Sequence, residues 1–217
     1  MEIEYLDPQE IEKRSFEIIE EECKKRGIVL PKDRAFLIKR VIHTTADFEY
    51  AGTLHFSEDA VKIAQDLLLQ GADIVTDTNM ALSGISRKVL SQFGGCLHCY
   101  IAEDEVAKEA AERNVTRASV SMENGMKLQK PVIFAIGNAP TALLKLREFY
   151  DAGKMPAFVI GVPVGFVNVE AAKEKIMETK IPCIVNRGRK GGSNVAAAIC
   201  NALLYDLKKR IPTDGQE

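Results

Sequence analysis

The sequence predicts an α/β protein: a doubly wound, mostly parallel sheet with helices on both faces and an N-terminal helical segment. From about residue 70 onward, short apolar runs alternate with segments of helical spacing, and this alternation implies right-handed crossovers between parallel strands. The runs are mostly continuously apolar, as expected when both faces of a sheet are covered. We expect residues 1–217 to form a single domain, with a helical part (1–70) and an alternating part (71–210).

The first 70 residues carry start and stop signals for helices. Asp7-Pro8-Gln9-Glu10 places a capping Asp before Pro at the first helical position, and Gly27 is a natural end for that helix. A second helix is expected after Pro31, and a third is expected to open at Ser57, with acidic residues in its first turn. His55 is predicted to lie in a loop and receives no role.

The alternating part contains five strand candidates. They are Ala72–Thr76, Cys96–Ile101, Pro131–Ile136, Ala157–Val162 and Ile181–Asn186. The helices expected around them are 105–113, 116–126, 141–152, 169–178 and 195–209. Charged positions on these helices, such as Lys173, are predicted to lie on a solvated surface.

Composition excludes several classes of protein. Lys and Arg total 29 against 31 Asp and Glu, a formal net charge of −2, which argues against a nucleic-acid-binding protein. No apolar run approaches the roughly 18 residues of a membrane helix, and the acidic N-terminus lacks the pattern of a secretory signal. The five cysteines are an odd number spread along the chain, which favours reduced thiols. We therefore expect a cytoplasmic protein without nucleic-acid or membrane partners.

Small and polar residues follow the predicted strands, where open α/β sheets bind ligands. In the segment 187–194, three cations stand among three glycines, which is typical of an anion-binding turn at a helix N-terminus. A solvated turn is the alternative, and the usual nucleotide-binding fingerprints are absent. On this argument the predicted ligand-binding residues are Gly137, Asn138, Thr141, Arg187, Arg189 and Ser193.

Two further groups could carry chemistry. His43 follows Arg40 by three residues, so both project from one helix face; the histidine is an acid/base candidate or an ordinary packed residue. Cys96, His98 and Cys99 suggest zinc, but a structural site needs four ligands, and strand alternation places Cys99 opposite the other two. We therefore predict no metal site.

Five segments, in order, resemble the precorrin-8X methylmutases, which are methyl-shifting isomerases of corrin (cobalamin) biosynthesis. The resemblance spans nearly the whole chain, and five motifs in the right order with similar spacings make it specific. The segments are Arg14–Ile19, Arg40–His43, Gly137–Leu143, Gly161–Val167 and Arg187–Ser193.

The resemblance implies a homodimer with active sites near the subunit interface and a tetrapyrrole substrate. A methyl group would move from ring position 11 to position 12 of precorrin-8 or its cobalt complex, giving hydrogenobyrinate or cobyrinate. No cofactor is implied, because any cobalt belongs to the substrate. His43 would be the proton donor and acceptor. The implied substrate contacts are Ser15, Arg40, Thr76, Arg87 and Arg117.

Some alternatives stay open at this point. After His43 the chain departs from the family pattern, and Asp47 could orient the histidine or cap a turn. The cobalt-containing substrate is favoured over the metal-free one, although no single residue decides between them. A corrinoid carrier without catalysis, a nucleotide-dependent α/β enzyme and a zinc enzyme are the rival functions.

Overall fold

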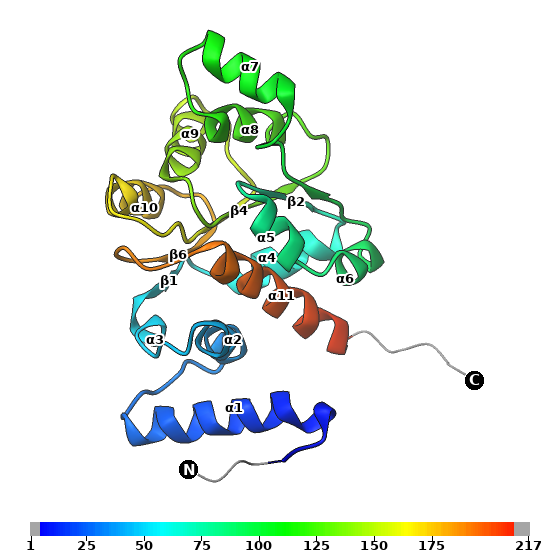
Figure 1. The fold of residues 1–217 in the computed structure, drawn as a ribbon, viewed down its shortest axis with the longest axis vertical. Coiled ribbons are helices and arrows are strands. Elements are labelled where there is room, and N and C mark those ends of the chain that lie inside the picture. The colour runs from blue at the N-terminus through cyan, green and yellow to red at the C-terminus, as the bar shows by residue number, and fades with distance from the viewer. Residues whose placement is uncertain (1–4, 211–217) are drawn as a thin grey trace, which may run out of the picture.

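The protein is described by a computed structural model that covers residues 5–210. Its centre is a six-stranded sheet with the strand order β1-β6-β5-β4-β2-β3 (Figure 1). Strand β1 runs antiparallel to β6, and the other neighbouring pairs are parallel. The predicted fold class is thus confirmed. The strands are β1 (Leu54–Phe56), β2 (Asp73–Thr76), β3 (Leu97–His98), β4 (Val132–Ile136), β5 (Phe158–Gly161) and β6 (Cys183–Asn186).

Helices cover both faces of this sheet. Figure 1 places α1 at one end of the long axis of the molecule and α7, α8 and α9 at the other. The helices are α1 (Pro8–Lys25), α2 (Ala35–Thr45), α3 (Tyr50–Thr53), α4 (Ala60–Leu69), α5 (Asn79–Gly84), α6 (Arg87–Gln92), α7 (Asp104–Glu112), α8 (Arg117–Gly125), α9 (Pro140–Asp151), α10 (Val169–Met177) and α11 (Ser193–Arg210). Within this described part no helix is long and apolar enough to cross a membrane.

The core has two main layers because strand side chains alternate between faces. Ile133 and Ala135 of β4 belong to one buried cluster, together with residues of α2, α4 and α11. Val132 and Phe134 of the same strand belong to the other, together with residues of α8, α9 and α10. Both faces of the sheet are therefore buried, which explains the continuously apolar strand sequences.

Strand β1 was not predicted. The prediction that His55 lies in a loop is wrong, because His55 is the middle residue of β1 and pairs with Val185. Three residues are too few to show the alternation of apolar and polar side chains that marks a strand. This segment becomes a strand because it pairs with β6. Ser57 does not begin a helix either: its hydroxyl accepts the Cys183 N–H at 2.8 Å, and α4 begins at Ala60.

Two short helices that were not predicted, α5 and α6, follow β2. The side chain of Thr78 caps α5 by accepting the Ala81 N–H at 3.1 Å. The predicted cap at Asp7 differs, because its backbone carbonyl, and not its side chain, accepts the Glu10 N–H. Helix α1 ends as expected just before Gly27, whose φ is +68°.

Candidate active site

His43 lies in the last turn of α2 and is exposed. The helix ends at Ala46, which adopts a left-handed conformation with φ +54°. The imidazole stacks on the ring of Phe16 from α1, with centroids 5.3 Å apart and planes inclined by 29°. An aromatic neighbour in offset contact restricts how the imidazole can turn. The candidate acid/base group is thus held while its edge remains open to a ligand.

Arg40 lies one turn before His43 and contacts the same aromatic ring. Its guanidinium carbon is 4.9 Å from the Phe16 centroid, and its Nη1 donates to the Glu12 carboxylate. Ser15 and His43 line a shallow pocket of about 380 Å³, and the Ser15 hydroxyl donates to the Ile11 carbonyl at 2.9 Å. The packing of α1 on α2 therefore brings together three predicted site residues, Ser15, Arg40 and His43.

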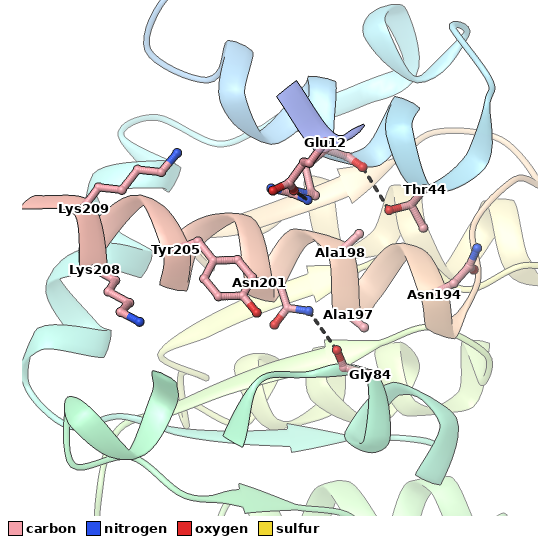
Figure 2. Close-up of a pocket in the computed structure, with 11 residues that line it drawn as sticks. Glu12, Thr44, Gly84, Asn194, Ala197, Ala198, Asn201, Tyr205, Lys208 and Lys209 are labelled. Atoms are coloured by element: carbon pink, nitrogen blue, oxygen red, sulfur yellow. Dashed lines mark hydrogen bonds and ion pairs between the residues drawn. The ribbon is translucent and has the colours of Figure 1, made fainter. Parts of the chain in front are cut away.

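A larger groove of about 760 Å³ opens beside Arg40, between α1 and α2 on one side and α5 on the other (Figure 2). Helix α11 forms its floor. Sequence reasoning did not find this groove, because the α11 residues that line it were assigned only to a helix. Its lining residues are Glu12, Arg40, Thr44, Gly84, Asn194, Ala197, Ala198, Asn201, Tyr205, Lys208 and Lys209.

Two predicted substrate contacts, Thr76 and Ser193, are buried. The Thr76 hydroxyl donates to the Thr78 carbonyl at 3.1 Å, and the hydroxyls of Thr78 and Ser193 lie 2.7 Å apart. These bonds join the end of β2 to the start of α11. In this structure Thr76 and Ser193 therefore have a structural role, because their buried hydroxyls stabilise the contact between β2 and α11.

The predicted anion site at Gly137, Asn138 and Ala139 is occupied by a carboxylate of the protein itself. Asp77, at the end of β2, accepts the N–H groups of these three residues at 2.6–2.9 Å. Burial raises the pKa of Asp77, although the three N–H donors oppose that rise. The expectation that the backbone of this loop binds a substrate anion is therefore corrected, since these three N–H groups are already bonded to Asp77. Thr141 likewise accepts a hydrogen bond from Thr116, at 3.0 Å.

Buried donors hold the loop after β6. Lys173 is fully buried, so the prediction that it lies on a solvated surface is wrong. Its ammonium donates to the carbonyls of Gly188 at 2.7 Å and Lys190 at 2.9 Å, and burial lowers its pKa to about 8. The Asn186 amide donates to the Lys190 carbonyl as well, at 2.9 Å. Hydrogen bonds to the carbonyl oxygens of Gly188 and Lys190 thus fix the conformation of this loop.

The cations of this loop are paired with acids on neighbouring elements. Arg187 pairs with Glu174 at 3.3 Å, and Arg189 pairs with Glu170 at 3.1 Å. Both pairs are exposed, so each holds its arginine only weakly. The predicted anion-binding arginines therefore pair with carboxylates of α10, and neither ion pair involves the α1–α2 site around His43.

Asp47 connects this loop to the end of α2. Its carboxylate accepts the Glu49 N–H at 2.9 Å and the Lys190 ammonium at 2.6 Å. That ammonium bond lowers the pKa of Asp47. Asp47 therefore caps the turn after His43, as one of the two sequence-based alternatives proposed.

The remaining predicted arginines lie at the starts of two other helices. Arg87 begins α6 and Arg117 begins α8, and both are exposed. Helix α8 lies at the opposite end of the long axis from α1 (Figure 1). One chain alone does not bring Arg117 to the α1–α2 site.

The cysteine–histidine segment forms no metal site. His98 lies 3.2 Å from the Asp73 carboxylate, while the Cys96 side chain is exposed and Cys99 is half-buried. Across residues 5–210 no three metal-ligating side chains are grouped so as to hold an ion.

Comparison with known proteins decides the family. The model of the family described as precorrin-8X methylmutase matches residues 10–206. The chain belongs to the precorrin-8X methylmutase family. It is 43% identical to the cobalt-precorrin-8 methylmutase of Salmonella typhimurium, over 93% of this chain and 97% of that one. It is 37% identical to the precorrin-8X methylmutase of Pseudomonas aeruginosa, with the same coverage.

A solved structure of the precorrin-8X methylmutase from Thermus thermophilus has the same fold. It superposes with a TM-score of 0.83 at 36% identity, covering 93% of this chain and 98% of that one. The resemblance noted from five sequence motifs is thus confirmed. A methylmutase transfers a methyl group within one molecule, so the predicted isomerase class is confirmed too.

Proposed function

We propose that this chain moves a methyl group between ring positions 11 and 12 of cobalt-precorrin-8, giving cobyrinate for cobalamin biosynthesis. Relatives at 38–43% identity carry the name cobalt-precorrin-8 methylmutase, which supports the cobalt-containing substrate over the metal-free one. The observation that carries the proposal is the exposed His43 imidazole, held by Phe16 beside Ser15 and Arg40.

His43 is proposed as the proton donor and acceptor. During the shift the bond from the methyl carbon to position 11 breaks and its bond to position 12 forms, so atoms and electrons balance within the substrate. Proton exchange with the conjugated ring would select the tautomer from which the shift is favourable. Such general acid–base catalysis is typically worth about 10²–10⁴-fold in rate. We expect no cofactor, since the rearrangement needs neither an oxidant nor a methyl donor.

Arg40 is proposed to bind a carboxylate at the edge of the macrocycle. A guanidinium binds carboxylates in a bidentate manner, and the Arg40 side chain is already adjacent to the groove and to Phe16. Ser15 lines the 380 Å³ pocket together with His43. Its hydroxyl would contribute a hydrogen bond to the substrate in that pocket.

We further propose that residues 1–217 form one domain and that two copies form the working enzyme in the cytoplasm. The pocket at His43 is shallow, and the Ile18 side chain at its rim is 42% exposed. A second copy would cover this apolar rim and exclude water from the ring. The far end of that copy would also offer residues such as Arg117, which one chain keeps apart from His43.

The test is anaerobic incubation of the purified protein with cobalt-precorrin-8, following the visible spectrum and the product mass. We expect a changed spectrum at unchanged mass, and loss of that change in His43→Ala. Near-full turnover by His43→Ala would contradict the proton-transfer role. Binding of the substrate without rearrangement would instead support a carrier, or a preference for the metal-free substrate.

A further inference from the structure

We propose that the 760 Å³ groove above α11 binds the carboxylate-bearing edge of the tetrapyrrole, and that Lys208 and Lys209 are carboxylate ligands there. This inference rests on the proposed function, because it names the substrate's position within the same enzyme. Sites for small molecules typically enclose about 300–1,000 Å³, so the groove is large enough to accept a major part of the macrocycle.

The floor of the groove includes small apolar residues. Ala197 and Ala198 of α11 present only methyl groups, and Gly84 of α5 adds backbone alone. A Cβ on Gly84 would lie 2.8 Å from the Ala197 Cβ, so the two helices approach too closely for a longer side chain. Small residues at this point therefore keep long side chains out of this part of the floor, which leaves room for a macrocycle (Figure 2).

The wall beside the floor is rigid. The Asn201 Nδ2 donates to the Gly84 carbonyl at 2.8 Å, and its Oδ1 accepts the Ser86 N–H at 2.8 Å. Both ends of this amide are thus engaged in joining α11 to the turn between α5 and α6. A preformed wall reduces the entropy lost when a ligand binds.

The open end of the groove is positively charged. Lys208 and Lys209 lie in the last turn of α11, are exposed, and have no ion pair with any residue of 5–210. The neighbouring carboxylate of Asp206 is already engaged, by Arg210 at 2.5 Å and by Gln65 at 2.9 Å. The two ammonium groups are therefore available to anions, and ammonium–carboxylate bonds are among the stronger hydrogen bonds.

Glu12 supplies the opposing charge. It lines the same groove and accepts a hydrogen bond from Arg40. A substrate carboxylate approaching Arg40 would have to displace Glu12, because both carboxylates need the same guanidinium. Glu12 therefore weakens substrate binding and stabilises Arg40 while the groove is empty.

The groove connects to the catalytic side of the site. A smaller pocket of about 140 Å³ is lined by Phe16, Arg40 and Lys209 among others, and the Phe16 ring stacks on His43. In Figure 2 the Lys209 side chain points to the side on which α1 and α2 lie. A macrocycle resting on α11 with its carboxylates at the lysines could thus extend across Phe16 towards His43.

The experiment measures cobyrinate binding by visible absorbance and turnover of cobalt-precorrin-8 in the full chain. For K208Q/K209Q we expect the Kd and the KM to rise by about 5–20-fold, with kcat nearly unchanged, because exposed charge pairs contribute modestly. For E12Q we expect the Kd to fall. A control, K154Q/K180Q, removes two exposed lysines outside the groove and should bind like the unaltered protein.

K154Q/K180Q removes the same charge as K208Q/K209Q, so weaker cobyrinate binding in K208Q/K209Q alone would separate carboxylate binding in the groove from a general effect of net charge. A derivative of cobyrinate with amides in place of its carboxylates should bind K208Q/K209Q and the unaltered protein equally. Equal cobyrinate affinity in K208Q/K209Q and K154Q/K180Q, with the unaltered protein active, would overturn this inference alone. An unaltered protein that rearranges neither form of the substrate would instead overturn the proposed function.

Discussion

The Phe16 ring of α1 stacks on the His43 imidazole of α2, with the ring centroids 5.3 Å apart. The same ring lies 4.9 Å from the Arg40 guanidinium. One aromatic side chain thus sets the positions of a proton-transfer group and a carboxylate ligand on successive turns of α2.

Replacing Phe16 by Leu should therefore lower kcat while changing the free energy of unfolding only a little. Leucine retains much of the apolar volume but not the flat face against the imidazole, and a loosely oriented catalytic group costs about 10-fold or more in rate. Steady-state kinetics on cobalt-precorrin-8 would measure the change, with Phe149→Leu on α9 as a control. An unchanged kcat in Phe16→Leu would mean that the stacking does not orient His43.

Asp77→Asn should destabilise the protein by about 2–4 kcal/mol. The carboxylate accepts three backbone N–H groups, whereas an amide has one oxygen and turns its NH₂ towards donors. Urea unfolding at neutral pH would measure the loss. The control is Asp66→Asn, whose carboxylate pairs with Lys62 on the surface and which should change stability by less than about 1 kcal/mol. Equal effects of the two variants would refute a structural role for Asp77.

Lys173→Met should lower the free energy of unfolding by about 1–3 kcal/mol at pH 7, because the Gly188 carbonyl loses a buried donor. The pH dependence should change as well. Burial lowers the pKa of Lys173 from 10.5 to about 8, so between these values the unfolded chain binds more protons than the folded one. Lys173 therefore makes stability rise with pH from about 8 to 10.5.

Urea unfolding of the unaltered protein and of Lys173→Met at several pH values from 7 to 10 would test this. The gap between the two stabilities should widen above pH 8 in favour of the unaltered chain. A gap that stays constant or narrows would show that the pKa of Lys173 is not lowered in the folded protein.

Gly137→Ala should be strongly destabilising. A Cβ there would lie 2.6 Å from the Ser193 Cα and 2.7 Å from the Ser193 nitrogen, so the start of α11 would have to move. Gly52→Ala is a suitable control, since a Cβ at Gly52 meets nothing within 4 Å. We expect a loss of about 1–3 kcal/mol for Gly137→Ala and little change or a small gain for Gly52→Ala, measured by thermal unfolding.

The strands of the parallel sheet could be predicted because the runs that contain them are mostly apolar and each is followed by a helix. Strand β1 could not, because its three residues form a strand only through their bonds to β6. Helices α5 and α6 were missed for a similar reason. Each has six residues, which is too short for a clear helical period.

The burial of Lys173 could have been predicted from the spacing of apolar residues on α10. It occupies one position of the stripe 169, 172, 173 and 176 on α10, whose other members are apolar and buried, and such spacing marks the core face of a helix. Asp77 had a weaker signal, a lone carboxylate at the end of a buried strand. Only the fold brings it opposite the N–H groups of Gly137 and Asn138, which are distant in the sequence.

The pairing of β1 with β6 also bears on how the chain folds during synthesis. The Thr53 hydroxyl donates to the Asn186 side chain across a sequence separation of 133 residues, and α2 packs on α11 over a similar separation. At about 5–20 residues per second, the first helices emerge from the ribosome well before their partners exist. We expect this early segment to stay exposed to chaperones and proteases until translation has passed β6 and α11.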